Sequence, residues 1–243
     1  MLIKRERIAA IIPAKNEALA IGNIIDNLKN NGYVDKVIVI DGNSKDGTVD
    51  IAKYHGADVF MAEGKGKGYD MRLFQKHIQE NPQNFGAYVM LDGDGTYHPE
   101  NVCNVAEPII LKDADVVIGS RYGRIKAEPG SQRNVNKFGN FLLTKAAGFL
   151  YQRSDITDLC SGYWGFSNEF FSSAPLTSNG FDFECDIFNH ALRNYRVKTV
   201  PIKFGKRRGN GKLSLLGACK IPLFYFPKYY SLSLLKNENN GKQ

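Results

Sequence analysis

The chain has 243 residues, a net charge of +7, a hydrophobic content of 43% and a charged content of 23%. This length allows one large α/β domain or two small ones, and the composition is typical of a soluble globular protein with a substantial core. The four cysteines, at positions 103, 160, 185 and 219, form no CxxC pair. Their spacing argues against a zinc site or a disulfide framework and favours free thiols in a reducing compartment. Residues 1–7 lack the apolar stretch of a secretory signal.

The positive charge is concentrated near the end of the chain. Between Ile187 and Glu238 there are eleven Lys or Arg residues and no Asp or Glu, so subtracting these eleven charges from +7 leaves −4 for the rest. An acidic region followed by a basic one predicts that the basic part meets an anion, either phosphate, acidic lipid or nucleic acid. A solvated basic face is the alternative interpretation.

The first 120 residues alternate between strand and helix patterns. Short apolar runs predict strands at 8–12, 37–40, 57–61, 87–91 and 116–119. Apolar residues at helical spacing predict helices at 17–30, 48–54, 67–79 and 99–111. We expect Pro13 to stop the first strand. This βαβαβ order predicts a mostly parallel sheet with helices on both faces and right-handed crossovers.

The alternation breaks after Ser120. Residues 122–133 read as a polar loop rich in Gly, Lys and Arg, long enough to act as a functional flap. Further helices are predicted at 135–151 and 184–194, and further strands at 162–167 and 197–204. In the first of these helices the expected apolar stripe consists of Phe138, Leu142, Leu143, Ala146 and Leu150.

The last apolar segment, 213–235, is rich in aromatic residues but contains two prolines and two lysines. Such a segment is a poor membrane-spanning helix. It either lies in the headgroup plane of a membrane, with its lysines toward anionic lipid, or covers the core of the domain. Both uses need the same amphipathic pattern, so the pattern leaves the choice open.

Two predicted strands end in carboxylates. The run 87–91 leads into Asp92-Gly93-Asp94, and the run 37–40 leads into Asp41. The carboxyl ends of parallel strands line the crevice in which such sheets bind ligands. Carboxylate oxygens at that edge suit Mg²⁺ or Mn²⁺, which bridge the phosphates of nucleotides. Together these runs predict a metal-dependent enzyme that acts on a nucleotide-linked donor.

Three further stretches suit a nucleotide. Asn16 and Glu17 open the first helix, where polar side chains contact a base or ribose or simply start the helix. In the turn 41–48, Asp41 is placed to accept from a ribose hydroxyl or a base N–H, while Asp46 caps the next helix. The loop Gly64-Lys65-Gly66-Lys67-Gly68 lets backbone amides approach a diphosphate, or is a plain flexible loop. It lacks the spacing of a P-loop.

These motifs, in this order, resemble the family 2 glycosyltransferases of the GT-A fold, and more narrowly the polyprenyl-phosphate (dolichol-phosphate) sugar synthases. The resemblance runs from Ile8 to Leu213. The matching stretches are Ile12-Pro13-Ala14-Lys15-Asn16-Glu17, the turn at 41–48, Gly66-Lys67-Gly68, Asp92-Gly93-Asp94, Gly119-Ser120-Arg121-Tyr122, residues 157–164, residues 180–184 and the basic residues 207–213.

The resemblance implies an α/β, GT-A (Rossmann-like) nucleotide-sugar-binding fold with a mostly parallel central sheet flanked by helices, and an inverting transfer of the sugar. Asp92 and Asp94 would bind Mg²⁺ or Mn²⁺, with Asp94 the more direct ligand. The residues expected around the nucleotide are Pro13, Asn16, Glu17, Asp41, Lys67 and Asp92. Those expected around the acceptor phosphate are Arg121, Arg133, Arg207, Arg208 and Lys212, because arginine forks match phosphate oxygens.

The residues expected to act in catalysis are Asp94, Arg121, Asp158 and Glu184. A phosphomonoester, with a second pKa of about 6, is already anionic near neutral pH and attacks without a strong base. The metal then stabilises the departing nucleoside diphosphate. A hydroxyl acceptor would need a carboxylate base, for which Asp158, Asp182 and Glu184 are the candidates. Alternatively, Asp158 forms a turn or cap and Glu184 anchors the basic loop.

The chain departs from the family pattern at three points. Gly42 follows Asp41 where many members have a second acid, so UDP is favoured only slightly over GDP. The QxxRW motif of processive polysaccharide synthases is absent from the sequence. The C-terminal transmembrane helices that some lipid-phosphate sugar synthases carry are not found in it either, so membrane contact would be peripheral.

The sequence therefore predicts a metal-dependent glycosyltransferase that moves a sugar from a nucleotide sugar to a polyprenyl (dolichyl) phosphate. We expect a catalytic domain at 1–212, an amphipathic segment at 213–243 that contacts a membrane surface, and a peripheral location on the cytoplasmic face. No nucleic-acid partner is expected, because it would leave the acids at the strand ends unexplained. The alternatives are a soluble glycosyltransferase acting on a hydroxyl of a saccharide or small molecule, and a nucleotidyltransferase, whose glycine-rich entry loop is missing.

Overall fold

The structure is a computed structural model that describes residues 6–122, 125, 128–129, 131, 134–180 and 182–207. The chain divides into two compact units, Met1–Asn210 and Gly211–Gln243. The domain boundary expected after residue 212 and the interfacial segment 213–243 lie outside the described residues and stay predictions. So do the predicted phosphate ligands Arg133, Arg208 and Lys212.

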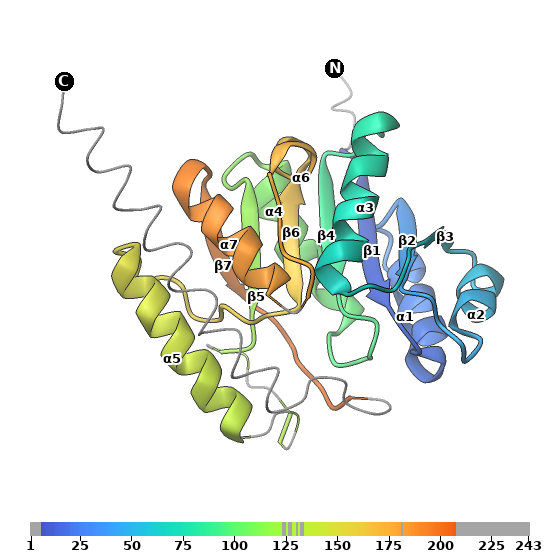
Figure 1. Ribbon diagram of the computed structural model, residues 1–243, viewed down its shortest axis with the longest axis horizontal. Coiled ribbons are helices and arrows are strands. Elements are labelled where there is room, and N and C mark those ends of the chain that lie inside the picture. Colours follow the sequence, from blue (N-terminus) through green and yellow to red (C-terminus); the bar gives the residue numbers. More distant parts are fainter. Residues whose placement is uncertain are drawn as a thin grey trace. The chain divides into compact units, whose positions relative to one another are not determined.

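Within the described residues, seven strands form one sheet in the order β3-β2-β1-β4-β6-β5-β7 (Figure 1). Every neighbouring pair is parallel except the two pairs that involve β6, which runs antiparallel to β4 and β5. The mostly parallel sheet predicted from the sequence is thus confirmed. The strands are β1 Ile8–Ala14, β2 Lys36–Asp41, β3 Asp58–Met61, β4 Ala87–Leu91, β5 Val116–Ser120, β6 Tyr163–Ser167 and β7 Val197–Pro201.

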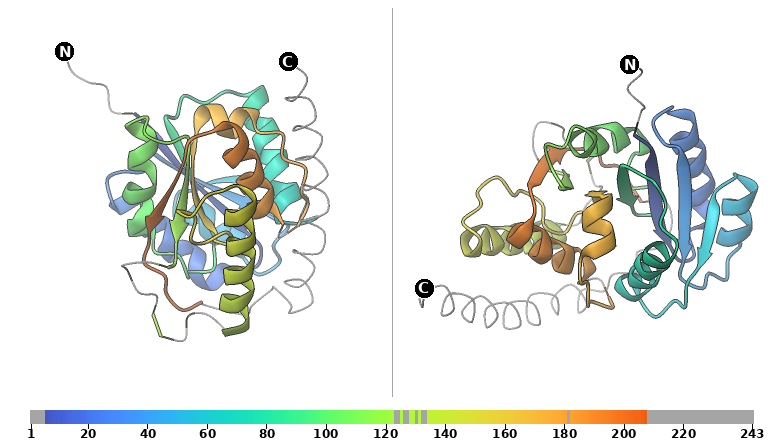
Figure 2. Two further views of the ribbon diagram at one scale, coloured as in Figure 1. Left: turned by 90° about the vertical axis from the view of Figure 1, so that its left-hand side faces the viewer. Right: turned by 90° about the horizontal axis from the view of Figure 1, so that it is seen from above.

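Helices cover both faces of this sheet (Figure 2). Helices α1 and α4 pack against one face, and α3 and α6 pack against the other. This layering follows from the predicted βαβ order, since each right-handed crossover returns its helix to a face of the sheet. The helices are α1 Ala18–Asn30, α2 Thr48–Tyr54, α3 Lys67–Glu80, the 3₁₀ turn η1 Pro99–Asn101, α4 Val102–Ile110, α5 Asn134–Leu150, α6 Asn168–Ser173 and α7 Phe183–Asn194.

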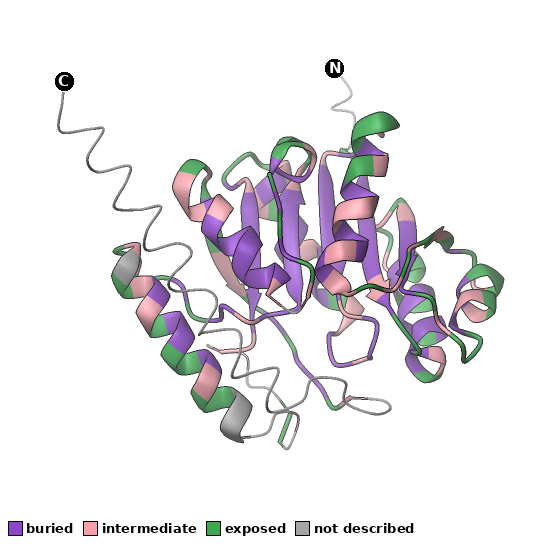
Figure 3. Cartoon of the chain, in the orientation of Figure 1, coloured by how far each residue is buried: buried purple, intermediate pink, exposed green. Residues whose placement is uncertain are grey.

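Successive side chains of each central strand enter opposite halves of the core, as the period of two in a strand requires. In β4, Val89 belongs to the cluster under α1 and α4, and its neighbour Tyr88 packs against Phe171 of α6 with ring centroids 4.7 Å apart. Both faces of the strand are therefore buried, which explains its continuous apolar run. Figure 3 shows the central strands buried along most of their length.

One local expectation was wrong, and one helix was missed. Pro13 does not stop the first strand, because β1 continues to Ala14 and Pro13 pairs with Ile40 of β2. The pairing of β1 with β4 has already ended at Ile11, so a residue without an N–H is tolerated there, as on an edge strand. The short helix α6 was not expected. It begins after Ser167, whose Oγ accepts a hydrogen bond from the backbone N of Phe170 at 3.1 Å.

The apolar stripe expected in α5 was wrong in part. Of its members, Leu143 is buried, whereas Phe138 and Leu142 are exposed; the buried side chains of α5 also include Asn140, Thr144 and Ala147. Two of the buried residues are polar, and apolar spacing alone does not select such a face. No helix in the described part of the chain combines the length and apolarity needed to cross a membrane.

Candidate functional site

The carboxyl ends of β1, β2 and β4 lie side by side, because Ala14 pairs with Asp41 and β1 also pairs with β4. Asp41 is fully buried at the end of β2. Its Oδ2 accepts a hydrogen bond from the backbone N of Ser44 at 2.9 Å, while its Oδ1 is buried without a hydrogen-bond partner in the described structure. A buried, unpartnered carboxylate oxygen is costly, so this atom is suited to accept a donor from a ligand.

The turn after β1 is held by Asn16. Its backbone has φ of 53°, its N–H bonds to Ser44 Oγ at 2.9 Å, and its Oδ1 accepts from the backbone N of Lys45 at 2.8 Å. These bonds tie the β1–α1 turn to the β2–α2 turn, which is a role that asparagine fulfils well because it tolerates positive φ. Asp46 joins the same turns, since it accepts from the backbone N of both Thr48 and Ala18.

Two carboxylates, Asp92 and Glu184, contact Lys67, the first residue of α3. Lys67 Nζ donates to Asp92 Oδ1 at 2.6 Å and also to Glu184 Oε1 on α7. Burial opposes the charge on Lys67, but Asp92 and Glu184 outweigh it and raise the lysine pKa above its ordinary value. Burial raises the pKa of Asp92 to about 6, with Lys67 opposing the shift and the charges of Asp94 and Glu184 adding to it. The cluster therefore carries an excess of negative charge.

Asp94 is held by a second cation. Its Oδ1 accepts from the backbone N of Thr96 at 3.0 Å and from Thr96 Oγ1 at 2.5 Å. Its Oδ2 accepts from Arg207 Nη1 at 2.7 Å, and Arg207 Nη2 donates to Glu17 Oε1 at 2.9 Å. Arg207 thus connects the end of the described chain to the start of α1 across the site.

The donor set fits a divalent metal that shares its coordination with phosphates. Among the described residues no group of three or more His, Cys, Asp and Glu side chains forms a complete metal cage. However, Mg²⁺ usually takes only one or two carboxylates and completes its shell with water and substrate phosphates. Asp92 lies against a glycine, since a Cβ at Gly162 would come within 2.1 Å of Asp92 Oδ2. This close backbone approach fixes the Asp92 carboxylate beside Asp94.

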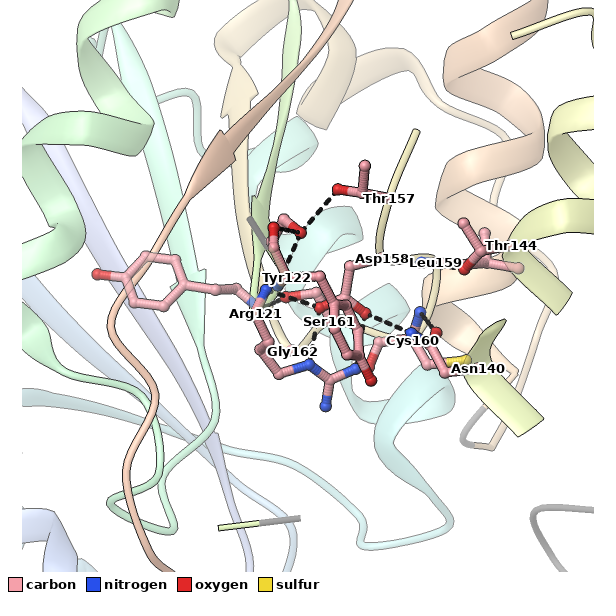
Figure 4. A network of polar contacts seen from close by, with 12 residues as sticks. Arg121, Tyr122, Asn140, Thr144, Thr157, Asp158, Leu159, Cys160, Ser161 and Gly162 are labelled. Atoms are coloured by element: carbon pink, nitrogen blue, oxygen red, sulfur yellow. Dashed lines mark hydrogen bonds and ion pairs between the residues drawn. The ribbon is translucent and has the colours of Figure 1, made fainter. Parts of the chain in front are cut away.

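Arg121, just after β5, forms a buried ion pair with Asp158 (Figure 4). Its Nε donates to Asp158 Oδ2 at 2.8 Å, its Nη2 donates to Asp158 Oδ1 at 2.7 Å, and its backbone N donates to Asp158 Oδ2 at 2.9 Å. Nη2 also reaches the carbonyl of Cys160 at 2.7 Å. In the described part of the chain no hydrogen bond occupies the remaining terminal nitrogen, Nη1.

Helix α5 supports this pair from the other side. Asn140 Nδ2 donates to Asp158 Oδ1 at 3.0 Å, and Asn140 Oδ1 accepts from the backbone N of Cys160 at 2.9 Å. Thr144 Oγ1 accepts from the backbone N of Leu159 at 3.1 Å. Asp158 therefore accepts hydrogen bonds from both Arg121 and Asn140 and is fully buried, which makes it a rigid anchor for the arginine.

The structure brings most of the sequence-predicted site residues together. One set is linked by Lys67 and Arg207 and contains Glu17, Asp92, Asp94 and Glu184. Arg121 and Asp158 form a second set. A residue that we did not single out, Tyr97, lies between the two sets. Its hydroxyl accepts a hydrogen bond from the backbone N of Gly162 at 2.6 Å. Burial raises the pKa of Tyr97, with Arg121 opposing the shift and Asp92 adding to it. The sequence signal that could have marked Tyr97 as a site residue was its position three residues after Asp94.

Asn140 was also missed, since it lies in a helix in which only the apolar residues were considered. A polar residue on the inner face of a helix needs a hydrogen-bond partner, and that rule would have marked it. The roles assigned to all these residues stay predictions, because their geometry does not show what they bind.

The fold is that of the GT-A glycosyltransferases. It superposes on glucosyl-3-phosphoglycerate synthase from Mycobacterium tuberculosis, in a crystal structure with Mn²⁺, UDP and glucosyl-3-phosphoglycerate, with a TM-score of 0.66. The superposition covers 86% of this chain and 73% of that chain at 22% sequence identity, and at this identity it shows the fold.

The chain belongs to glycosyl transferase family 2, whose family model matches residues 9–173. It is 34% identical over 205 residues to the glycosyltransferase AglJ of Haloferax volcanii, covering 83% of this chain and 64% of AglJ, which is less than two thirds of that relative. It is 28% identical over 228 residues to an undecaprenyl-phosphate mannosyltransferase of Micrococcus luteus, covering 86% of this chain and 88% of the relative. The predicted family, fold and enzyme class are confirmed.

Proposed function

We propose that this glycosyltransferase moves a sugar from a nucleotide sugar to a polyprenyl phosphate, with inversion at the anomeric carbon and with Mg²⁺ or Mn²⁺. The observation that carries the proposal is the state of the three carboxylates that could serve as a base. Asp158 is bound by Arg121 and Asn140, Glu184 by Lys67, and Asp182 Oδ1 accepts from the backbone N of Gly180 at 3.0 Å. A site whose acids are all engaged favours an acceptor that is already anionic.

The donor would bind at the ends of β1, β2 and β4. The buried Oδ1 of Asp41 has no hydrogen-bond partner in the described structure, and a base N–H would satisfy it. Uracil and guanine each offer an N–H next to a carbonyl, so this contact is open to either base. The crystal structure of the mycobacterial synthase contains UDP, and this supports UDP over GDP.

The metal would be held by Asp94, with Asp92 beside it. When bound, the ion would balance the charge that develops on the departing diphosphate. Lys67 holds Asp92 and Glu184 in place, and Arg207 holds Asp94 and Glu17. These two cations stabilise a buried group of acids that would otherwise repel each other, and because the four acids outnumber the two cations, the remaining negative charge supports binding of a further cation.

The acceptor phosphate would bind at Arg121. Asp158 fixes one edge of the guanidinium and leaves Nη1 for the ligand, so we assign Asp158 a positioning role in place of the base that its motif allowed. The related undecaprenyl-phosphate mannosyltransferase carries a polyprenyl phosphate in its name, and this supports the acceptor class. Because polyprenyl phosphates reside in membranes, the proposal includes a peripheral location, on the cytoplasmic face.

The test is a transfer assay with labelled UDP- and GDP-sugars, Mg²⁺ or Mn²⁺, and a short polyprenyl phosphate, read by thin-layer chromatography of the lipid fraction. The matched acceptor control is the same polyprenol without its phosphate. We expect labelled lipid only with the phosphate and the metal. Labelling of the free alcohol, or of a saccharide in preference to the lipid phosphate, would show that the enzyme uses a hydroxyl acceptor and would refute the proposal.

A further inference from the structure

Helix α5 has an outward face that is as apolar as its buried face. Phe138, Phe141, Leu142 and Phe149 are 64%, 55%, 52% and 85% exposed. The opposite side of the helix carries the buried residues Asn140, Leu143, Thr144 and Ala147. Figure 3 shows buried and exposed residues alternating along α5. A helix that only covers its own domain has a polar outward face, so this arrangement needs another explanation.

The four exposed residues form one continuous stripe, which we call the aromatic face. At 3.6 residues per turn, positions 138, 141, 142 and 149 fall within an arc of about 100° around the helix axis. Lys145 lies within the same arc, with its Nζ 5.8 Å from the centroid of the Phe141 ring. Contiguous exposed apolar surface of this kind marks an interaction site in soluble proteins.

Charge selects the partner of the aromatic face. Helix α5 contains Lys137 and Lys145 and no acidic residue. A second copy of α5 would bring the same positive charges together. An anionic bilayer accepts phenylalanine and leucine among its acyl chains and lysine among its headgroups, and it fits both properties.

We propose that the aromatic face of α5 lies on the surface of an anionic lipid bilayer and sets the height of the acceptor site above it. This inference rests on the proposed function. The buried face of α5 holds Asp158 through Asn140, and Asp158 holds Arg121 (Figure 4). One helix therefore contacts the membrane on one side and the arginine of the acceptor site on the other. The phosphate of a polyprenyl phosphate lies at headgroup level, where this helix would place Arg121.

The first test measures binding of the full chain to vesicles by co-sedimentation, using phosphatidylcholine vesicles with and without phosphatidylglycerol. The variant is the double substitution Phe141→Ser and Phe149→Ser, and the matched control is Leu19→Ser on α1, where Leu19 is 78% exposed. We expect the wild type and the control to bind the anionic vesicles equally well. We expect the double variant to bind them at least on the order of tenfold more weakly. Unchanged binding of the double variant would overturn the proposal.

A second measurement reports the position of α5 directly. The only tryptophan, Trp164, is fully buried, so its fluorescence is a constant background. In Phe149→Trp we expect the emission to shift to shorter wavelength on adding anionic vesicles, and brominated lipids to quench it. An emission that responds to protein concentration instead of to lipid, together with a dimer in size-exclusion chromatography, would show that a second copy covers the face and would overturn the proposal.

The transfer assay separates this inference from the proposed function. We expect the double variant to transfer normally to a water-soluble short-chain prenyl phosphate and poorly to a long-chain polyprenyl phosphate in vesicles. Loss with both acceptors would mean that these phenylalanines support the site itself, and the membrane role would fall. If the wild type binds vesicles through α5 but labels no lipid phosphate, the aromatic face remains a membrane surface and the proposed acceptor is wrong.

Discussion

The substitution Asp158→Asn tests whether Asp158 anchors Arg121 or acts as a base. The Asp158 side chain is fully buried, and Arg121 and Asn140 donate four hydrogen bonds to it, at 2.9, 2.8, 2.7 and 3.0 Å. The amide keeps the shape but removes the negative charge and turns one acceptor into a donor. Removing one partner of a buried ion pair costs about 3–5 kcal/mol. For a domain of this size, that loss lowers the unfolding temperature by about 6–20 °C.

The chain offers a matched control in Asp155→Asn. Asp155 forms the same two-pronged pair with Arg153, at 2.7 and 2.6 Å, but both side chains are partly exposed. An exposed pair contributes only about 0–1 kcal/mol, so the control should unfold close to the wild-type temperature. Scanning calorimetry of the three proteins at neutral pH measures the difference.

Kinetics complete this test. An anchor role predicts that Asp158→Asn raises the KM for the lipid phosphate and leaves the affinity for the nucleotide unchanged, because only Arg121 is released. A base role predicts a lower kcat with the KM for the lipid phosphate unchanged. If Asp158→Asn unfolds no earlier than Asp155→Asn, the reasoning from the buried pair is refuted.

Three further predictions concern the carboxylate cluster. The variant Asp94→Ala should still fold but lose transfer, and a folded variant with normal turnover would remove Asp94 from the metal site. Gly162→Ala should weaken Mn²⁺ binding on the order of tenfold, since its Cβ would lie 2.1 Å from Asp92 Oδ2, whereas Gly139→Ala, with nothing within 4 Å, serves as the control in the same titration. The pKa of Asp92 is raised from 3.8 to about 6 on folding, so the folded chain holds this proton more tightly than the unfolded chain does. As the pH rises from 3.8 to about 6, the free energy of unfolding should therefore fall by more in the wild type than in Asp92→Asn. Equal slopes in the two proteins would contradict the pKa shift.

Local patterns predicted most of the α/β core. The runs that end at Leu91 and Ile40 are apolar because both faces of a central parallel strand are covered, and this signal needs no knowledge of the partner strands. Right-handed crossovers then bring the ends of those strands to one edge, so Asp41, Asp92 and Asp94 could be placed together before any coordinates were known.

The pattern was insufficient where tertiary contacts decide. The buried face of α5 contains Asn140 and Thr144, which are stabilised by the segment 158–160, and its outward face contains phenylalanines. Periodicity places both faces equally well, since each repeats at helical spacing, and only the packing partner distinguishes them. The expectation based on Phe138 and Leu142 therefore selected the wrong face.

The sequence by itself determined the order of the strands and of the helices other than α6, the family, and the acids at the strand ends, because these follow from local chemistry and from connections between neighbouring elements. Only the tertiary structure decided which charges pair. Lys67 with Glu184 and Arg207 with Glu17 are separated by 117 and 190 positions in the chain. The energy of an ion pair depends on distance and burial in three dimensions, and the linear sequence contains neither quantity.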